Sequence, residues 1–284
     1  MSWFILAVLS VTFYSLATIA QRVMMKEDDS DPTAFMIVFQ FLVTVVIIGY
    51  FLITKLSIPN ILPVLPNLLL NGFLIAVASL SMFKGLKLIE AADFTIIGTS
   101  STFWGLITAS IFLKEAVTIE KIAGTILIVM GVIIVTAQKK NGAIGFQKGH
   151  LYSLISASAF GISFTNEAFI VSQIGVMQNL LIGFFLPGLI VLLLYPKSIV
   201  KMKLLLKPNK MIKMTVFSML YLFGAIAIFS AYKSGGEVSK IFPIGKAEVI
   251  FTAILGAFIL KEYDHPVKKI LGVLTTFGGV LLLR

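Results

Sequence analysis

The sequence ASIFLKE at residues 109–115 and the sequence GAFILKE at residues 256–262 each end a long apolar run in Leu-Lys-Glu. Each ending is followed by another apolar run in which two glycines stand seven residues apart. These glycines are Gly124 and Gly131 after the first ending, and Gly272 and Gly279 after the second. We assign them to close helix packing. The recurrence of both features in the same order indicates an internal duplication.

The first and sixth apolar runs extend this correspondence. Tyr14 and Gln21 in the first run align with Phe160 and Glu167 in the sixth at a constant offset. We therefore predict a tandem duplication of about 140 residues that covers the whole chain.

The composition is that of a membrane protein. Hydrophobic residues make up 58% of the chain and charged residues 13%, and the mean hydropathy is +1.02. A soluble fold cannot bury so large an apolar fraction, and the continuous runs lack the two-residue period of barrel strands. Runs of roughly 20 apolar residues predict ten transmembrane helices. They are residues 2–21, 33–54, 65–83, 92–113, 119–137, 151–171, 177–195, 211–232, 238–260 and 267–283.

The odd number of helices in each half determines the topology. A second copy of a five-helix unit must enter the membrane from the side opposite to the first. We predict an all-α membrane protein of ten transmembrane helices, arranged as two inverted five-helix repeats at residues 1–140 and 148–284. Inverted repeats suit alternating access around a site near the membrane midplane.

These features resemble the drug/metabolite transporter superfamily, and within it the EamA-type branch with two EamA domains. The resemblance covers essentially the entire chain and is carried by the paired Leu-Lys-Glu endings, the paired glycines and the ten-span layout. It implies transport of a small solute. One position departs from the family pattern, because Pro243 lies in the ninth span where a proline is common, whereas the matching residues 98–101 include none.

Ionisable residues inside the predicted spans are candidates for function, because an unpaired charge in a membrane is costly. Lys246 and Glu248 lie in the ninth span, about 200° apart on an ideal helix. Pro243 and Gly245 favour a break just before them, and a broken helix would expose backbone groups to a substrate. The alternative is that Lys246 pairs with a neighbouring carboxylate and only stabilises the bundle.

A polar stripe on the sixth span contains Ser156, Ser163, Asn166 and Glu167. The spacing places these residues close to one helical face, which we expect to look into the bundle. We take Glu167 as a proton or cation site, or as the anchor of a substrate amine, and Asn166 as its neighbour in the site. The alternative is that the span ends near Phe164 and that Glu167 meets water at the interface.

Four further residues complete the predicted substrate site. Tyr14 and Gln21 share a face of the first span, and Trp104 lies in the fourth span near several threonines. Such groups around a cavity would suit an amphipathic metabolite such as an amino acid or a nucleoside-like compound. Lys84, at the end of the third span, is included, although a solvated helix end explains it as well.

Other classes of protein are disfavoured. The net charge of +10 lies mainly in loops at helix ends, where lipid headgroups attract it, so we predict no nucleic-acid partner. The chain has no cysteine, only two histidines near loops, and no phosphate-binding loop, so we predict no enzyme, no metal site and no cofactor. The expected partners are a small-molecule substrate, membrane lipids and a coupling proton or cation. The sequence indicates no oligomeric state.

Two indications of membrane orientation disagree. Most of the 23 Lys and Arg residues lie in the loops after odd-numbered spans, which the positive-inside rule places in the cytoplasm, with both termini outside. The related transporters generally have both termini in the cytoplasm. No cleavable signal peptide is evident at residues 2–20, which have no basic n-region and run on into further spans.

The sequence therefore predicts a multi-pass plasma-membrane protein that is a secondary transporter. We expect it to export a small metabolite by alternating access. One alternative is a membrane scaffold, sensor or partner subunit with no transport activity. Another is an enzyme that acts on lipid, which would need a cluster of acid, base or metal-binding residues that the sequence does not offer.

Overall fold

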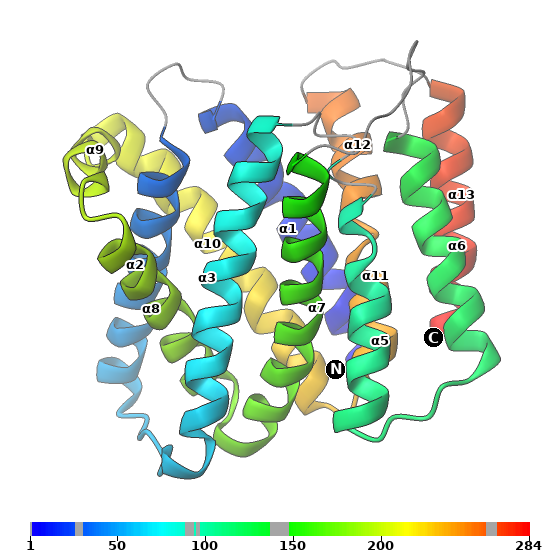
Figure 1. Cartoon of the computed structure of the whole chain (residues 1–284), viewed down its shortest axis with the longest axis horizontal. Helices are drawn as coiled ribbons and strands as arrows, with labels where there is room; N and C mark the ends of the chain where they lie inside the picture. Colours follow the sequence, from blue (N-terminus) through cyan, green and yellow to red (C-terminus); the bar gives the residue numbers. More distant parts are fainter. Residues whose placement is uncertain (1, 26–30, 89–93, 95–96, 137–147, 260–265) are drawn as a thin grey trace.

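Helices are the only regular elements in the part of the chain that the structure describes. The computed structural model describes residues 2–25, 31–88, 94, 97–136, 148–259 and 266–284. Its helices form one bundle (Figure 1), and the predicted all-α class is confirmed. The elements are α1 (Trp3–Met25), α2 (Pro32–Thr54), η1 (Leu62–Val64), α3 (Leu65–Leu88), α5 (Ser101–Phe112), α6 (Ile119–Thr136), α7 (Lys148–Ile174), α8 (Val176–Leu194), α9 (Ser198–Leu205), α10 (Pro208–Lys233), α11 (Val238–Gly245), α12 (Glu248–Ile259) and α13 (Pro266–Leu283).

Six helices are long and apolar enough to cross a membrane. They are α1, α2, α3, α7, α8 and α10, which correspond to the predicted spans one, two, three, six, seven and eight. Within the described residues, α5 and the segment Ile270–Leu283 of α13 are apolar but shorter. The count of ten spans therefore stays a prediction.

The start of α2 shows how the local sequence sets a helix boundary. Asp31 is the N-cap, and its Oδ1 accepts the Ala34 N–H at 2.9 Å. Pro32 fits the first helical position because that position has no intrahelical hydrogen bond to lose. Asp31 Oδ2 also pairs with Lys201 Nζ at 2.7 Å, which ties α9 to α2. This short helix lies between two predicted spans, where the sequence predicts no helix.

The expected break in the ninth span is present. The helix α11 ends at Gly245, α12 begins at Glu248, and Lys246–Ala247 form a turn between them. Pro243 lies inside α11, in its last turn. Because a proline cannot donate a backbone hydrogen bond, it weakens the helix at this point.

The fourth span is also broken, although it contains no proline. Thr99–Ser100 form a turn immediately before α5. Ser101 Oγ donates to Gly98 O, and Thr102 Oγ1 donates to Thr99 O, both at 2.7 Å. Hydroxyl groups that bond to nearby carbonyls compete with the helical ladder, so they give a physical reason for a break that the sequence pattern did not predict.

Backbone contact joins α6 to α13. A Cβ atom on Gly279 would lie 2.7 Å from Gly124 O, and one on Gly131 would lie 2.7 Å from Gly272 O. A real side chain cannot occupy that space, so the two helices can approach this closely only because of these glycines. Their assignment to close helix packing is confirmed.

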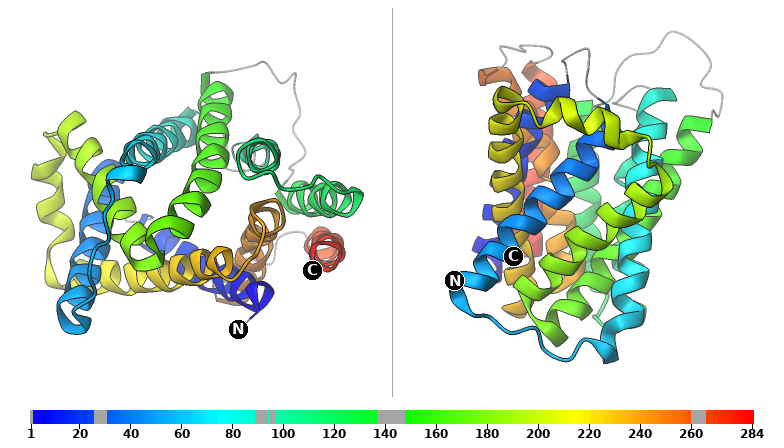
Figure 2. Two further views of the ribbon diagram at one scale, coloured as in Figure 1. Left: turned by 90° about the horizontal axis from the view of Figure 1, so that it is seen from below. Right: turned by 90° about the vertical axis from the view of Figure 1, so that its left-hand side faces the viewer.

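Helices from the two halves of the chain are interleaved. The most extensive contacts join α6 to α13, α3 to α7 and α1 to α10, and each pair takes one helix from each half. The helices α1 and α7 run through the bundle in opposite directions (Figure 1). Seen from below, α6 and α13 lie at one edge and α2 lies at the opposite one (Figure 2, left).

Candidate functional site

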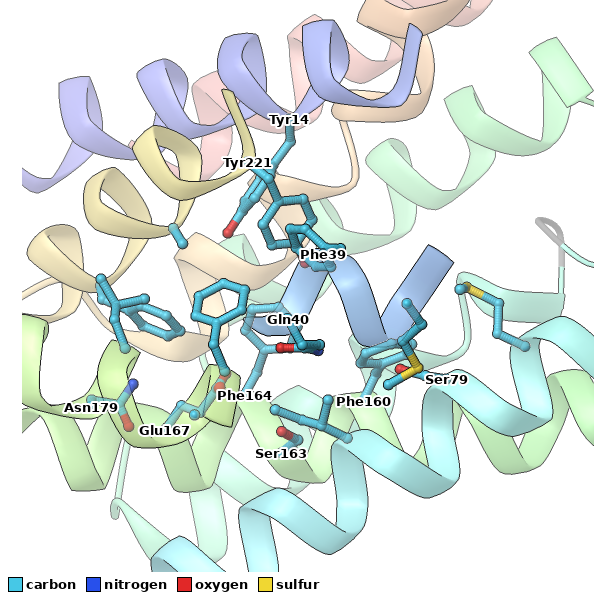
Figure 3. Close-up of a pocket in the computed structure, with 18 of the residues that line it drawn as sticks. Tyr14, Phe39, Gln40, Ser79, Phe160, Ser163, Phe164, Glu167, Asn179 and Tyr221 are labelled. Atoms are coloured by element: carbon cyan, nitrogen blue, oxygen red, sulfur yellow. The ribbon is translucent and has the colours of Figure 1, made fainter. Parts of the chain in front are cut away.

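A cavity of about 170 Å³ lies between the six long helices α1, α2, α3, α7, α8 and α10. Nine of the 21 described residues that line it are aromatic, namely Tyr14, Phe35, Phe39, Phe160, Phe164, Phe184, Phe217, Tyr221 and Phe229. The side chains with polar groups beyond these are Gln21, Gln40, Ser79, Ser163, Glu167 and Asn179. Figure 3 shows Glu167 and Asn179 toward one end of the cavity and Ser79 toward the other. A largely apolar cavity with a few polar groups is typical of a small-molecule site.

The aromatic residues on one side of the cavity brace one another. The ring centroids of Phe39 and Tyr221 are 4.8 Å apart, as are those of Tyr14 and Tyr221. Phe217 lies 4.9 Å from Phe39 on the same measure. Tilted and edge-on ring contacts of this kind are favourable. The rings therefore form a preorganised wall to which helices α1, α2 and α10 all contribute.

Glu167 is the only acidic or basic side chain among the described residues that line the cavity. It is 6% exposed and lies seven residues before the end of α7, so the carboxylate is buried in the bundle and does not meet water at a helix end near Phe164. Asn71 Nδ2 donates to Glu167 Oε1 at 3.1 Å, and Ser163 Oγ donates to Asn71 Oδ1 at 2.8 Å. These two bonds orient the carboxylate toward the cavity that it lines.

Two buried amides in the cavity wall have unused hydrogen-bonding capacity. Among the described residues, Gln40 Oε1 has no hydrogen-bond partner, and neither do Asn179 Oδ1 and Nδ2. A buried polar atom without a partner costs about 1–3 kcal/mol. A ligand that bonds to these atoms would recover that free energy.

The structure brings three of the predicted site residues together. Tyr14, Gln21 and Glu167 all line the cavity. Tyr14 and Gln21 are seven residues apart, which is two helical turns, so they lie on the same face of α1.

Helix geometry separates Asn166 from Glu167. Consecutive helical residues point about 100° apart, and Asn166 exchanges hydrogen bonds with Asn67 at 2.7 and 2.8 Å. It lines a second pocket of about 300 Å³ with Leu70, Phe112 and Phe169. The prediction that Asn166 shares one site with Glu167 is not met.

Lys246 and Glu248 do not line the cavity either. Lys246 follows the break after α11, with Nζ 5.0 Å from the centroid of the Phe242 ring. The carboxylate of Glu248 accepts the Thr18 hydroxyl at 2.6 Å, from the helix that carries Tyr14. Neither side chain is therefore part of the cavity wall that the described residues form. The role of Lys246 stays a prediction.

Trp104 and Lys84 lie at the outside of the bundle. Trp104 is 39% exposed, and its Cβ packs close to Gly161. Lys84 is exposed near the end of α3, with Nζ 5.8 Å from the centroid of the Tyr152 ring. A solvated helix end, the alternative stated for Lys84, describes this position.

Sequence reasoning missed several cavity residues. Gln40 stands as an isolated amide in an otherwise apolar run, and Asn179 follows Gln178 at the start of another. These amides are a usable signal because an unpaired amide in lipid is costly. Asn71 does not line the cavity, but it bonds to Glu167 from α3. Tyr221 and the phenylalanines carried no such signal, since aromatic residues also face lipid.

A polar cluster joins the residues after α5 to the start of α11, and Glu115 is at its centre. Glu115 Oε1 accepts the Val238 N–H at 2.7 Å, and Oε2 accepts the Ser239 N–H at 2.9 Å and the Ser239 hydroxyl. The carboxylate therefore caps the N-terminus of α11. Beside it, Lys121 pairs with Glu237 at 3.0 Å, and the Lys121 side chain is only 3% exposed.

Metal chemistry finds no support at this site. Across the described parts of the chain, no three His, Asp or Glu side chains gather in a way that could hold a metal ion.

The bundle of apolar helices around a small, largely apolar cavity and the family match given next define an integral multi-pass membrane protein of the transporter class. The EamA-like transporter family matches residues 1–137 and 147–284, and the chain belongs to that family of the drug/metabolite superfamily. A solved structure described only as "Crystal structure of protein" shares the fold, with a TM-score of 0.79 and 12% identity over 99% of this chain and 95% of that chain. No curated protein matches the chain.

Proposed function

We propose that the chain is a secondary transporter that exports a small metabolite across the plasma membrane by alternating access. In this proposal ten spans form two inverted five-helix repeats, residues 1–140 and 148–284, and the cavity between the six long helices is the substrate site. The observation that carries the proposal is that the two halves supply the cavity wall at corresponding positions.

The correspondence holds helix by helix. Tyr14 and Gln21 of α1 are 146 residues before Phe160 and Glu167 of α7, and all four line the cavity. The pattern recurs in α2 and α8. The cavity is lined by residues 35, 36, 39 and 40 of α2, and with the same spacing by residues 179, 180, 183 and 184 of α8. Two related units that run in opposite directions and share one site are the arrangement that alternating access needs.

Matched helix breaks support the same proposal. Thr99–Ser100 and Lys246–Ala247 are 147 residues apart, the same offset that separates the two Leu-Lys-Glu endings. Breaks in corresponding helices allow each half to bend independently at an equivalent point.

The cluster around Glu115 fits the closed end of such a transporter. It joins the residues after α5 to the start of α11, so it crosses between the two halves. Alternating access requires that these bonds break when the opposite end of the bundle closes.

Flux into proteoliposomes made from the purified chain alone tests the proposal, with amino acids, nucleosides and amines as solutes. A matched pair of variants identifies the site. Gly183 lines the cavity and Gly49 does not, and at both positions an added Cβ meets nothing within 4 Å. We expect Gly183→Trp to fill the cavity and abolish flux, and Gly49→Trp to leave it unchanged.

Two outcomes would overturn the proposal. An absence of flux for every solute, with the protein correctly folded, would favour a scaffold, sensor or partner subunit. Flux that survives Gly183→Trp would place the route of the solute elsewhere. Reporter fusions at both termini would decide between the two orientations.

A further inference from the structure

The charge of the cavity limits which solutes it can hold. Glu167 supplies the one formal charge on the described cavity wall, and that charge is negative. Lys246 and Lys84, the basic residues predicted for the site, do not line the cavity. An anionic solute would therefore bring its charge next to a buried carboxylate, whereas a cation would neutralise it.

The fold itself does not require a charge at this position. Gln21, a neutral amide, occupies the corresponding position in the first half of the chain and also lines the cavity. An amide would also accept the hydrogen bond that Asn71 donates to Glu167. The carboxylate is therefore best explained by a ligand.

Aromatic rings accompany the carboxylate. Phe164 lies one helical turn before Glu167 on α7, and Figure 3 shows the two side chains close together at one end of the cavity. The electron-rich face of an aromatic ring attracts a cation, most strongly where water is excluded. The remaining rings offer an apolar surface to the rest of a ligand, in contacts that are favourable for aromatic groups.

The free hydrogen-bonding atoms in the wall are mainly acceptors. Among the described residues, Gln40 Oε1 and Asn179 Oδ1 lack partners, as does one donor, Asn179 Nδ2. The Glu167 carboxylate, a further acceptor, lies on the same wall. An ammonium group carries only donors. It can therefore bond to these acceptors without leaving an unpaired group of its own.

We propose that the cavity binds a monovalent organic ammonium ion with an aromatic or apolar body, with its nitrogen at Glu167 and its body against the aromatic wall. This assignment rests on the proposed function, since it names the class of solute for the same site. It narrows the predicted amphipathic metabolite to a cationic one.

Three probes of similar size and different charge test the assignment on the purified full-length protein. They are 2-phenylethylammonium, 2-phenylethanol and 3-phenylpropanoate. Binding is measured directly by titration calorimetry and, independently, by the rise in the unfolding temperature that a ligand of the folded state produces. We expect the ammonium ion to bind at least tenfold more tightly than the alcohol, and the carboxylate to bind most weakly.

The variants identify the origin of the preference. Glu167→Gln keeps the shape and the Asn71 bond, and it should lower the preference for the cation over the alcohol by at least tenfold. Glu120→Gln, an exposed carboxylate at the start of α6, is the matched control and should leave the preference unchanged. Phe164→Leu keeps an apolar group but removes the ring, and should lower the preference about threefold.

The outcomes separate this inference from the proposed function. If all three probes bind equally, if none binds, or if Glu167→Gln keeps the full preference, the cation assignment is wrong. The protein could instead transport a neutral or anionic solute, with a flux that Gly183→Trp abolishes. In that case the proposed transporter function holds, and only the assignment of a cationic solute is wrong. Should Glu167→Gln fail to fold, the Phe164→Leu preference alone decides, and an unchanged value counts against the proposal.

Discussion

Removal of the Glu115 carboxylate should loosen the start of α11. The side chain bonds to two backbone N–H groups, at 2.7 and 2.9 Å, and to the Ser239 hydroxyl. Loss of a helix cap costs about 1 kcal/mol, and loss of a charged hydrogen bond to a half-buried group adds about 1–2 kcal/mol. We therefore expect Glu115→Ala to destabilise the protein by about 2–3 kcal/mol.

Thermal unfolding of the detergent-purified protein measures the effect. In soluble domains of 150–250 residues about 1 kcal/mol corresponds to about 2–4 °C, so the unfolding temperature should fall by about 5–10 °C. Hydrogen exchange should show faster exchange of the amides of Val238 and Ser239, since these lose their acceptor. Glu120→Ala removes an exposed acidic residue from the next helix and is the control. Equal unfolding temperatures for the two variants, with unchanged exchange at α11, would refute the capping role.

Three further predictions concern the helix packing, the α2 cap and the orientation. Gly131→Ala should destabilise the protein by at least about 2 kcal/mol, because the added Cβ would lie 2.7 Å from Gly272 O. Gly278→Ala is the control and should be neutral or stabilising, because an added Cβ there meets nothing within 4 Å. Thermal unfolding compares the two variants. Partial burial of Asp31 opposes ionisation, but the bonds from Lys201 and Ala34 outweigh it and lower the pKa of the carboxyl. The ionised Asp31 carboxylate should therefore contribute fully to the free energy of unfolding above the unfolded-state pKa of about 4. This contribution should be lost as the pH falls through the lowered folded-state pKa. In Asp31→Asn the unfolding temperature should therefore depend less on pH between about pH 5 and 2. If the positive-inside rule holds, a reporter fused in the α9 segment should report a cytoplasmic location and reporters at both termini an external one; the reverse result would favour the orientation of the related transporters.

The helical class and most of the helix positions could be predicted from the sequence, because a membrane leaves few other choices for long apolar runs. The break at Lys246 was predictable from Pro243. The break at Thr99 was not, because it depends on serine and threonine hydroxyls that bond to their own backbone. The helix α9 was also missed, since its apolar run is too short to register beside the spans.

The site was only partly predictable for a different physical reason. Residues on one helix, such as Tyr14 and Gln21, can be placed together from their spacing alone. Gln40 and Asn179 reach the cavity from two other helices, and only the packing of those helices brings them to Glu167 (Figure 3). Trp104 shows the opposite case, because its chemistry suits a site but the helix turns its side chain outward.

The glycine contact between α6 and α13 limits how the bundle can change shape. Where the two backbones touch at these glycines, neither helix can shift without a clash, so this pair should move as one rigid unit. No described residue of either helix lines the cavity, so this pair lies apart from the proposed substrate site. If the remaining helices rock, they should move relative to this pair. Distance labels placed on α6 and α13 should therefore report the same separation in every state of the protein.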